Sequence, residues 1–201
     1  MKPKLAFAAA ASVIVALVGG TYVWSQRTAA LDCLPGGTVA GAIGGPFTLV
    51  SETGETVTDE DVITGPTLIY FGYTFCPDVC PLDTARNAEA VDVLGEMGHE
   101  VKPVFITVDP ARDTPEELSY FTDNLHPDML GLTGSEEQVR VAKQAYRAYG
   151  QAQQGDDEYY LVDHSTFTYL VLPETGFADF YRRDLTPEDM AERVACVLDS
   201  V

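Results

Sequence analysis

The chain has 201 residues, of which 46% are hydrophobic and 10% aromatic, with 12 Lys and Arg against 31 Asp and Glu and a formal net charge of −19 at pH 7. This length suits one domain with an appendage, and this composition supports a folded core rather than a disordered chain. The acidic balance argues against nucleic-acid binding, which needs a basic face, and fits a cation or a basic partner better.

The charge is unevenly distributed along the chain. Residues 1–27 contain three basic groups and no acidic group, whereas the remaining 174 residues carry 9 basic and 31 acidic groups, a net charge of −22. We therefore expect two physically different pieces. The first is a positively charged N-terminal segment, and the second is an acidic domain.

The N-terminal segment is typical of a membrane anchor. No residue from Leu5 to Trp24 is charged, and twenty helical residues span ~30 Å, the thickness of a bilayer core. Lys2 and Lys4 precede this run and are expected to stay on the cytoplasmic side. We predict an anchor over residues 1–27, with a cleaved signal sequence as the alternative. Either one places the rest of a bacterial chain in an oxidising compartment.

The rest of the chain indicates an α/β domain. Residues 28–45 are rich in Ala and Gly and predict a linker, so the domain is expected over 46–201. Its pattern predicts a hairpin, a buried strand, a helix, a second strand, a capped helix, a short strand, a second capped helix, a hairpin and a last capped helix. The first hairpin is expected over 46–62, the buried strand over 67–73, its helix to about 97 and the second strand over 101–108. The two middle capped helices are expected to begin at 114 and 135. The second hairpin is expected over 159–172 and the last helix over 186–198. Such an alternation predicts a mixed sheet.

The most informative local feature is the segment Phe75-Cys76-Pro77-Asp78-Val79-Cys80-Pro81. It lies where the buried strand passes into a helix, and the positive end of a helix lowers the pKa of nearby thiols. Pro81 cannot occupy a helix interior without a clash. We therefore expect either that Pro81 begins the helix and both cysteines precede it, or that the first turn is distorted. Cys76 and Cys80 alone fit a redox pair, a metal-binding pair or a structural disulfide.

A metal site needs another ligand, and the chain has three histidines. His99 is expected on an exposed turn, and His126 in a packing or capping role. His164 lies at a turn between two apolar strands, from which it can project toward the cysteine loop. Two thiolates with one imidazole suit Cu(I), whereas Zn(II) prefers a fourth ligand. Asp78, Asp163 and residues 156–158 add negative potential, and Asp163 is a candidate for orienting His164.

These residues resemble the SCO/SenC family of membrane-anchored copper proteins, which assist assembly of the binuclear Cu-A centre of cytochrome c oxidase. The resemblance covers Gly44 to the C-terminus. It is carried by Gly44-Gly45-Pro46-Phe47, Tyr70-Phe71-Gly72-Tyr73-Thr74-Phe75-Cys76-Pro77-Asp78-Val79-Cys80-Pro81, Val108-Asp109-Pro110, Arg112-Asp113-Thr114-Pro115, Gly131-Leu132-Thr133-Gly134 and Asp163-His164-Ser165-Thr166-Phe167-Thr168-Tyr169.

The resemblance implies a thioredoxin-like fold with a mixed sheet, an extra N-terminal β-hairpin, a β-hairpin insertion and one transmembrane helix. It implies copper, as Cu(I), Cu(II) or both, bound by Cys76, Cys80 and His164. The implied partners are the Cu-A domain of cytochrome c oxidase subunit II and a copper donor protein. The implied location is the bacterial inner membrane, with a single pass and the domain in the periplasm. Asp109 and Arg112 are interpreted as a structural ion pair or cap.

Other functions use the same thiols. A thiol–disulfide oxidoreductase would use Cys76 and Cys80 as its catalytic pair, to keep the Cu-A cysteines reduced, and a copper-responsive signalling protein would use the same site. A metallochaperone is favoured over an enzyme. Thiol peroxidases of the glutathione-peroxidase type usually place a Trp near the nucleophilic residue. The single Trp here, Trp24, lies in the apolar N-terminal run, so this class is disfavoured. Cys33 and Cys196 are not recognised as family features. We consider a disulfide between them; the alternative is a buried Cys196, with Cys33 free or pairing between chains.

Overall fold

The computed structural model describes residues 43–155 and 159–201. The predicted anchor and most of the predicted linker lie outside these residues. Within the described part of the chain, no helix is long and apolar enough to cross a membrane. The strands are β1 (Thr48–Ser51), β2 (Thr56–Thr58), β3 (Thr67–Gly72), β4 (Lys102–Thr107), β5 (Leu130–Thr133), β6 (Gly150–Ala152), β7 (Val162–His164), β8 (Thr168–Leu172) and β9 (Gly176–Tyr181). The helices are α2 (Asp59–Val62), α3 (Val79–Glu96), α4 (Pro115–Asp123), α5 (Glu136–Ala145) and α6 (Pro187–Leu198).

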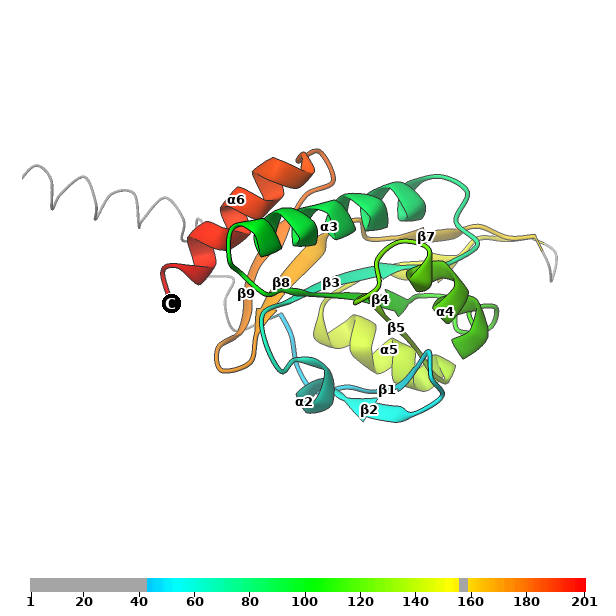
Figure 1. Cartoon of the computed structure of the whole chain (residues 1–201). Helices are drawn as coiled ribbons and strands as arrows, with labels where there is room; N and C mark the ends of the chain where they lie inside the picture. Colours follow the sequence, from blue (N-terminus) through cyan, green and yellow to red (C-terminus); the bar gives the residue numbers. More distant parts are fainter. Residues whose placement is uncertain (1–42, 156–158) are drawn as a thin grey trace, which may run out of the picture.

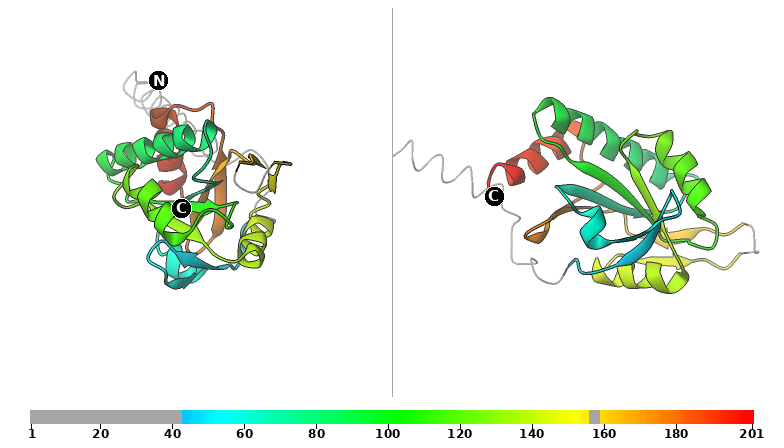
Figure 2. Two further views of the ribbon diagram at one scale, coloured as in Figure 1. Left: turned by 90° about the vertical axis from the view of Figure 1, so that its right-hand side faces the viewer. Right: turned by 60° about the horizontal axis from the view of Figure 1, so that its bottom comes forward.

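A mixed sheet organises the described residues. Its order is β2-β1-β5-β4-β3-β8-β9, in which β3, β4 and β5 run parallel while β1 and β8 are antiparallel to their inner neighbours. Every residue of β3 is buried, as expected for a strand with both faces covered. Helices α3 and α6 lie side by side over one face and α5 lies over the other (Figures 1 and 2). The predicted α/β architecture with a mixed sheet is confirmed.

Local sequence chemistry places the starts of the helices. The side chains of Thr114, Ser135 and Thr186 each accept the backbone N–H three residues on. A hydroxyl in this position satisfies an amide that has no partner within the helix, which stabilises a helix by ~1 kcal/mol. The three capped helices predicted from these residues are therefore confirmed. The same chemistry at Thr58 starts the short helix α2 inside the segment predicted as a hairpin.

Apolar side chains fill both faces of the sheet. Beneath α3 and α6 lie residues that include Leu68, Leu94, Leu170, Met190 and Val194. A second, larger cluster reaches the cysteine loop and occupies both faces: Phe105 and Leu118 lie on the α3 side, whereas Phe71, Leu132, Tyr146 and Tyr169 lie on the α5 side. Full burial of a large apolar side chain contributes ~1.5–3 kcal/mol, so the two clusters stabilise the packing of the helices on the sheet.

The predicted hairpin over 159–172 is wrong in its pairing. β7 pairs with β6, in a two-stranded sheet separate from the main one, while β8 pairs with β3 and β9. Gly176, at a φ of +72°, takes the left-handed backbone that a tight turn between β8 and β9 requires. His164 is consequently carried by a ribbon, β6–β7, that lies outside the main sheet.

The two ends of β3 have different neighbours. At its first residue, Thr67 pairs with Val171 of β8, which itself pairs with Phe177 of β9. Gly44, near the start of the described chain, lies against Phe177. At the last residue of β3, a Cβ placed on Gly72 would lie 3.0 Å from the Cys80 sulfur. The described chain therefore begins beside the end of β3 that is remote from the cysteines.

Candidate metal centre

Three side chains predicted as ligands meet at the carboxyl end of β3. The sulfurs of Cys76 and Cys80 and a ring nitrogen of His164 all lie within 4.8 Å of one another. Cys80 and His164 are 84 positions apart along the chain, yet Cys80 Sγ is 3.2 Å from His164 Nε2. Both cysteines are buried and reduced, and His164 is half-buried.

The start of α3 sets the spacing of the two sulfurs. The helix begins at Val79, so Cys80 lies in its first turn. Of the two predicted arrangements, the one in which Pro81 begins the helix and both cysteines precede it is therefore wrong. Pro81 is tolerated as the third helical residue because the first amides of a helix have no partner within it. Asp78, the N-cap, makes no side-chain capping bond; the Cys76 sulfur instead accepts the Cys80 backbone N–H at 3.4 Å.

A glycine brings the Cys80 sulfur close to the strand. A Cβ at Gly72 would lie 3.0 Å from Cys80 Sγ and 2.8 Å from a ring carbon of Phe105. Real Cβ atoms do not approach sulfur or ring carbon that closely. Gly72 therefore allows the sulfur to pack directly on the backbone of β3.

The two thiols have opposite pKa shifts. Burial opposes ionisation of Cys76, but the backbone N–H groups of Asp78, Cys80 and Val79 act in the opposite direction, and the pKa of Cys76 is lowered below its ordinary value. Burial raises the pKa of Cys80 well above its ordinary value, and the neighbouring Cys76 adds to this effect. Of the two thiols, Cys76 is therefore the one that ionises more readily.

The protonation of His164 follows from its neighbours. His164 Nδ1 lies 2.8 Å from the carbonyl oxygen of Ser165, and a carbonyl only accepts, so Nδ1 carries the proton. In the neutral ring, Nε2 is then the acceptor, and the Cys80 sulfur lies 3.2 Å from it. The rings of Tyr70 and Tyr73 stand edge-on to the imidazole, at 6.2 and 5.7 Å between centroids. Asp163 accepts a hydrogen bond from Gln153 instead, so the suggestion that Asp163 orients His164 is wrong.

A buried carboxylate supports the cysteine loop from behind. Asp113 has no exposed surface and accepts hydrogen bonds from the Thr74 backbone N–H, the Thr74 hydroxyl and the Thr107 hydroxyl. Burial raises its pKa to about 6, although these hydrogen bonds act in the opposite direction. Sequence reasoning missed this role; the only signal was an Asp immediately before the helix-capping residue Thr114.

The Asp109–Arg112 ion pair was predicted and is present. Arg112 Nε is 2.6 Å from Asp109 Oδ2, and both side chains are largely buried. Sequence reasoning did not predict that the guanidinium also lies against aromatic rings, one of them on Tyr160.

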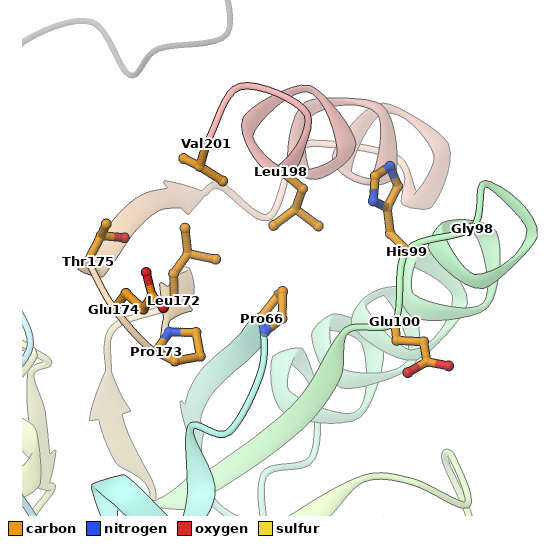
Figure 3. Close-up of a pocket in the computed structure, with 10 residues that line it drawn as sticks. All are labelled: Pro66, Gly98, His99, Glu100, Leu172, Pro173, Glu174, Thr175, Leu198 and Val201. Carbon is orange, nitrogen blue, oxygen red and sulfur yellow. The ribbon is translucent and has the colours of Figure 1, made fainter.

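The remaining histidines lie elsewhere. His126 is buried, accepts the Asp128 backbone N–H and faces Asp92 at 3.3 Å, which agrees with the predicted packing and capping role. His99 is half-buried rather than exposed and lies 3.5 Å from Asp199. It lines a cavity of about 400 Å³ at the start of β3 (Figure 3), which contains none of the three predicted ligands. Residues 156–158 lie outside the described part of the chain.

The donor set determines which ion fits. Two sulfurs and one imidazole nitrogen, with no further Cys, His, Asp or Glu in the cluster formed by the described residues, match the preference of Cu(I) for thiolate and low coordination. A hard cation such as Mg²⁺ or Ca²⁺ prefers oxygen ligands, and this cluster offers none. The site is that of a soft, thiophilic metal.

Comparison with known proteins agrees with the site. The family model described as SCO1/SenC matches residues 36–199. Protein SenC of Rhodobacter capsulatus is 54% identical over 203 residues, covering 98% of this chain and 92% of that protein. The crystal structure of Arabidopsis thaliana ScoI with copper bound is 38% identical, with a TM-score of 0.77 over 80% of this chain and 100% of that one. BsSco, a member of the Sco family of cytochrome c oxidase assembly proteins in which a disulfide switch is described, is 25% identical, with a TM-score of 0.62 over 79% of this chain and 93% of that one. The predicted thioredoxin-like α/β fold is thereby confirmed.

Proposed function

Because the chain belongs to the SCO1/SenC family, we propose that it is a copper metallochaperone that assists assembly of the Cu-A centre of cytochrome c oxidase. The observation that carries the proposal is the convergence of the Cys76 and Cys80 sulfurs with His164 Nε2 within 4.8 Å. Copper is the cargo, and these three side chains are its ligands.

The protonation states suggest how the cargo is received. Cys76 loses its proton more readily than Cys80 and is the more exposed of the two, at 8% against 0%, so it is the first sulfur to bind the metal. Cys80 must lose its proton, and the His164 Nε2 lone pair is then free to ligate. Binding therefore releases a proton, as is general for thiol ligands. When copper passes to a partner, the three ligands are replaced one at a time by ligands of the partner, and Cys80 regains its proton.

The setting follows from the N-terminal sequence. Residues 1–27 would hold the chain in the bacterial inner membrane as a single pass, with the domain in the periplasm. A copper donor protein would load this chain, and the recipient of the copper would be the Cu-A domain of oxidase subunit II. The acidic surface, with a net charge of −22 on residues 28–201, favours a basic partner face.

The test compares ligand variants in the full chain and in cells. We expect Cys76→Ala, Cys80→Ala and His164→Ala each to lose tight copper binding, and Cys76→Ala to lower the Cu-A content of the oxidase in the producing strain. His99→Ala is the matched control, because His99 lines the cavity at the other end of β3. Full copper retention in His164→Ala, or normal Cu-A content in the Cys76→Ala strain, would contradict the proposal.

A second function is supported by the thiol asymmetry. A thiol with a lowered pKa beside a more deeply buried thiol with a raised pKa is the arrangement used in dithiol exchange. Cys76 would attack a substrate disulfide and form a mixed disulfide; Cys80 would then attack Cys76, releasing a reduced substrate and leaving a Cys76–Cys80 disulfide. His164 separates the two functions. If His164→Ala abolishes copper binding and keeps the exchange rate, the two activities are distinct; a Cys76/Cys80 potential below about −300 mV, like that of structural disulfides, would argue against exchange.

A further inference from the structure

Three segments of the chain meet around one guanidinium group. Arg112 lies in the loop between β4 and α4, and its side chain is only 13% exposed. Its guanidinium carbon is 3.6 Å from the ring centroid of Tyr160 and 5.0 Å from that of Phe75. Stacking of this kind is worth about 0.5–2 kcal/mol, with the larger values where the cation is desolvated. Arg112 therefore joins the segment before Cys76 to the segment before β7.

The same contacts are completed by one carboxylate. Asp109 accepts from Arg112 Nε through Oδ2, at 2.6 Å, and from the Tyr160 hydroxyl through Oδ1, at 2.7 Å. Arg112 Nη2 is buried without a hydrogen-bond partner, which is consistent with a guanidinium that faces rings rather than polar groups. The planar shape of the group, and not only its charge, is thus used in this position.

The segment before β7 depends on such contacts. β7 pairs only with β6, outside the main sheet, and Figure 1 places it at the same end of the molecule as the loops that follow β3 and β4. The Val162 backbone N–H donates to the Tyr73 hydroxyl at 3.3 Å, and Tyr160 stacks on Arg112. The main sheet therefore holds this ribbon, and with it His164, largely through side chains.

We propose that Arg112 is a positioning residue of the metal centre. By stacking on Tyr160 and Phe75 while paired to Asp109, it fixes the ribbon that bears His164 against the loop that bears Cys76, and so sets the distance from the imidazole to the two sulfurs. This inference rests on the proposed copper-binding function and adds a requirement to it: the third ligand is in place only while the stack is intact.

The direct test is Arg112→Lys, which keeps the charge and removes the planar group. In the full chain, competition for Cu(I) with a chelator is expected to show a 10–100-fold loss of affinity, the range found when a group that orients a metal ligand is removed. Arg140→Lys is the control, because Arg140 makes an exposed ion pair with Glu137 on α5. It is expected to bind copper as the parent chain does.

A double-mutant cycle separates positioning from a general loss of stability. If Arg112 acts through His164, then Arg112→Lys combined with His164→Ala binds copper no more weakly than His164→Ala alone. The thiolate-to-Cu(II) absorption band of Arg112→Lys should also shift toward that of His164→Ala. Additive losses, or an unchanged band, would overturn the inference.

Further outcomes distinguish this inference from the function on which it rests. Unchanged affinity in Arg112→Lys, with affinity lost in His164→Ala, refutes the positioning role and leaves the proposed function standing. Unchanged affinity in His164→Ala refutes both. Should Arg112→Lys fail to fold by circular dichroism, Tyr160→Leu removes the stacked ring while leaving the Asp109–Arg112 pair, and the same cycle with His164→Ala then decides.

Discussion

Replacement of Asp113 by Asn is expected to change how the stability of the domain depends on pH. In the folded chain, burial raises the pKa of Asp113 from its ordinary value of 3.8 to about 6. The protonated carboxyl is thus favoured by folding, and its contribution is fully present below pH 3.8 and is lost as the pH rises through about 6. A difference of about 2 pKa units corresponds to about 3 kcal/mol, because each unit is worth ~1.4 kcal/mol. Asn has nearly the same shape and does not titrate.

Urea unfolding of the parent chain and of Asp113→Asn, measured over a series of pH values, isolates this group. The free energy of unfolding of the parent minus that of the variant should fall by about 2 kcal/mol between about pH 4.5 and pH 7.5. Loss of the Asp113 hydrogen bonds to Thr74 and Thr107 shifts this difference in unfolding free energy by a constant amount at every pH and does not change how it varies with pH. A difference that stays flat across this range would refute the assignment of a raised pKa to Asp113.

Three further changes test the site and its surroundings. Gly72→Ala should lower the free energy of unfolding by ~1–3 kcal/mol, through overpacking, and should weaken copper binding; unchanged urea and copper titrations would count against the close contact with Cys80. Iodoacetamide at neutral pH should modify Cys76 before Cys80, which mass spectrometry of the peptides can follow, and equal rates would disprove the asymmetry. Peptide mapping without reduction should recover Cys33 joined to Cys196, a link that could contribute roughly 5 kcal/mol in the chain-entropy model; an alkylated Cys33 would exclude it.

Helix starts were predictable because the chemistry that defines them is local. Each cap, at Thr114, Ser135 and Thr186, involves a hydroxyl and an amide three residues on. The buried strand β3 was predictable for a similar reason, since its apolar run is contiguous. The start of α3 was harder, because the capping atom there is the Cys76 sulfur, which ordinary capping rules do not consider.

Pairings between distant segments were not predictable from pattern alone. The exposed segment Gln151–Ala152 has no strand-like composition, and it becomes part of β6 only because β7 lies beside it. In the same way, the ion pair of Arg112 with Asp109 is a contact over three positions, whereas its stack on Tyr160 crosses to another part of the fold. The Cys76, Cys80 and His164 set was suggested by residue types, and its selection among alternatives came from the family resemblance.

The place where the described chain begins has a mechanical consequence. Gly44 lies near the first residue of β3, whereas the sulfurs lie beyond its last residue, and six residues of strand measure ~20 Å. A tether that attaches where the described chain begins would therefore hold the domain at one end, with the metal site at the opposite end. A longer tether would extend the reach of the metal site, and the site would still lie at the end of the domain opposite the point of attachment.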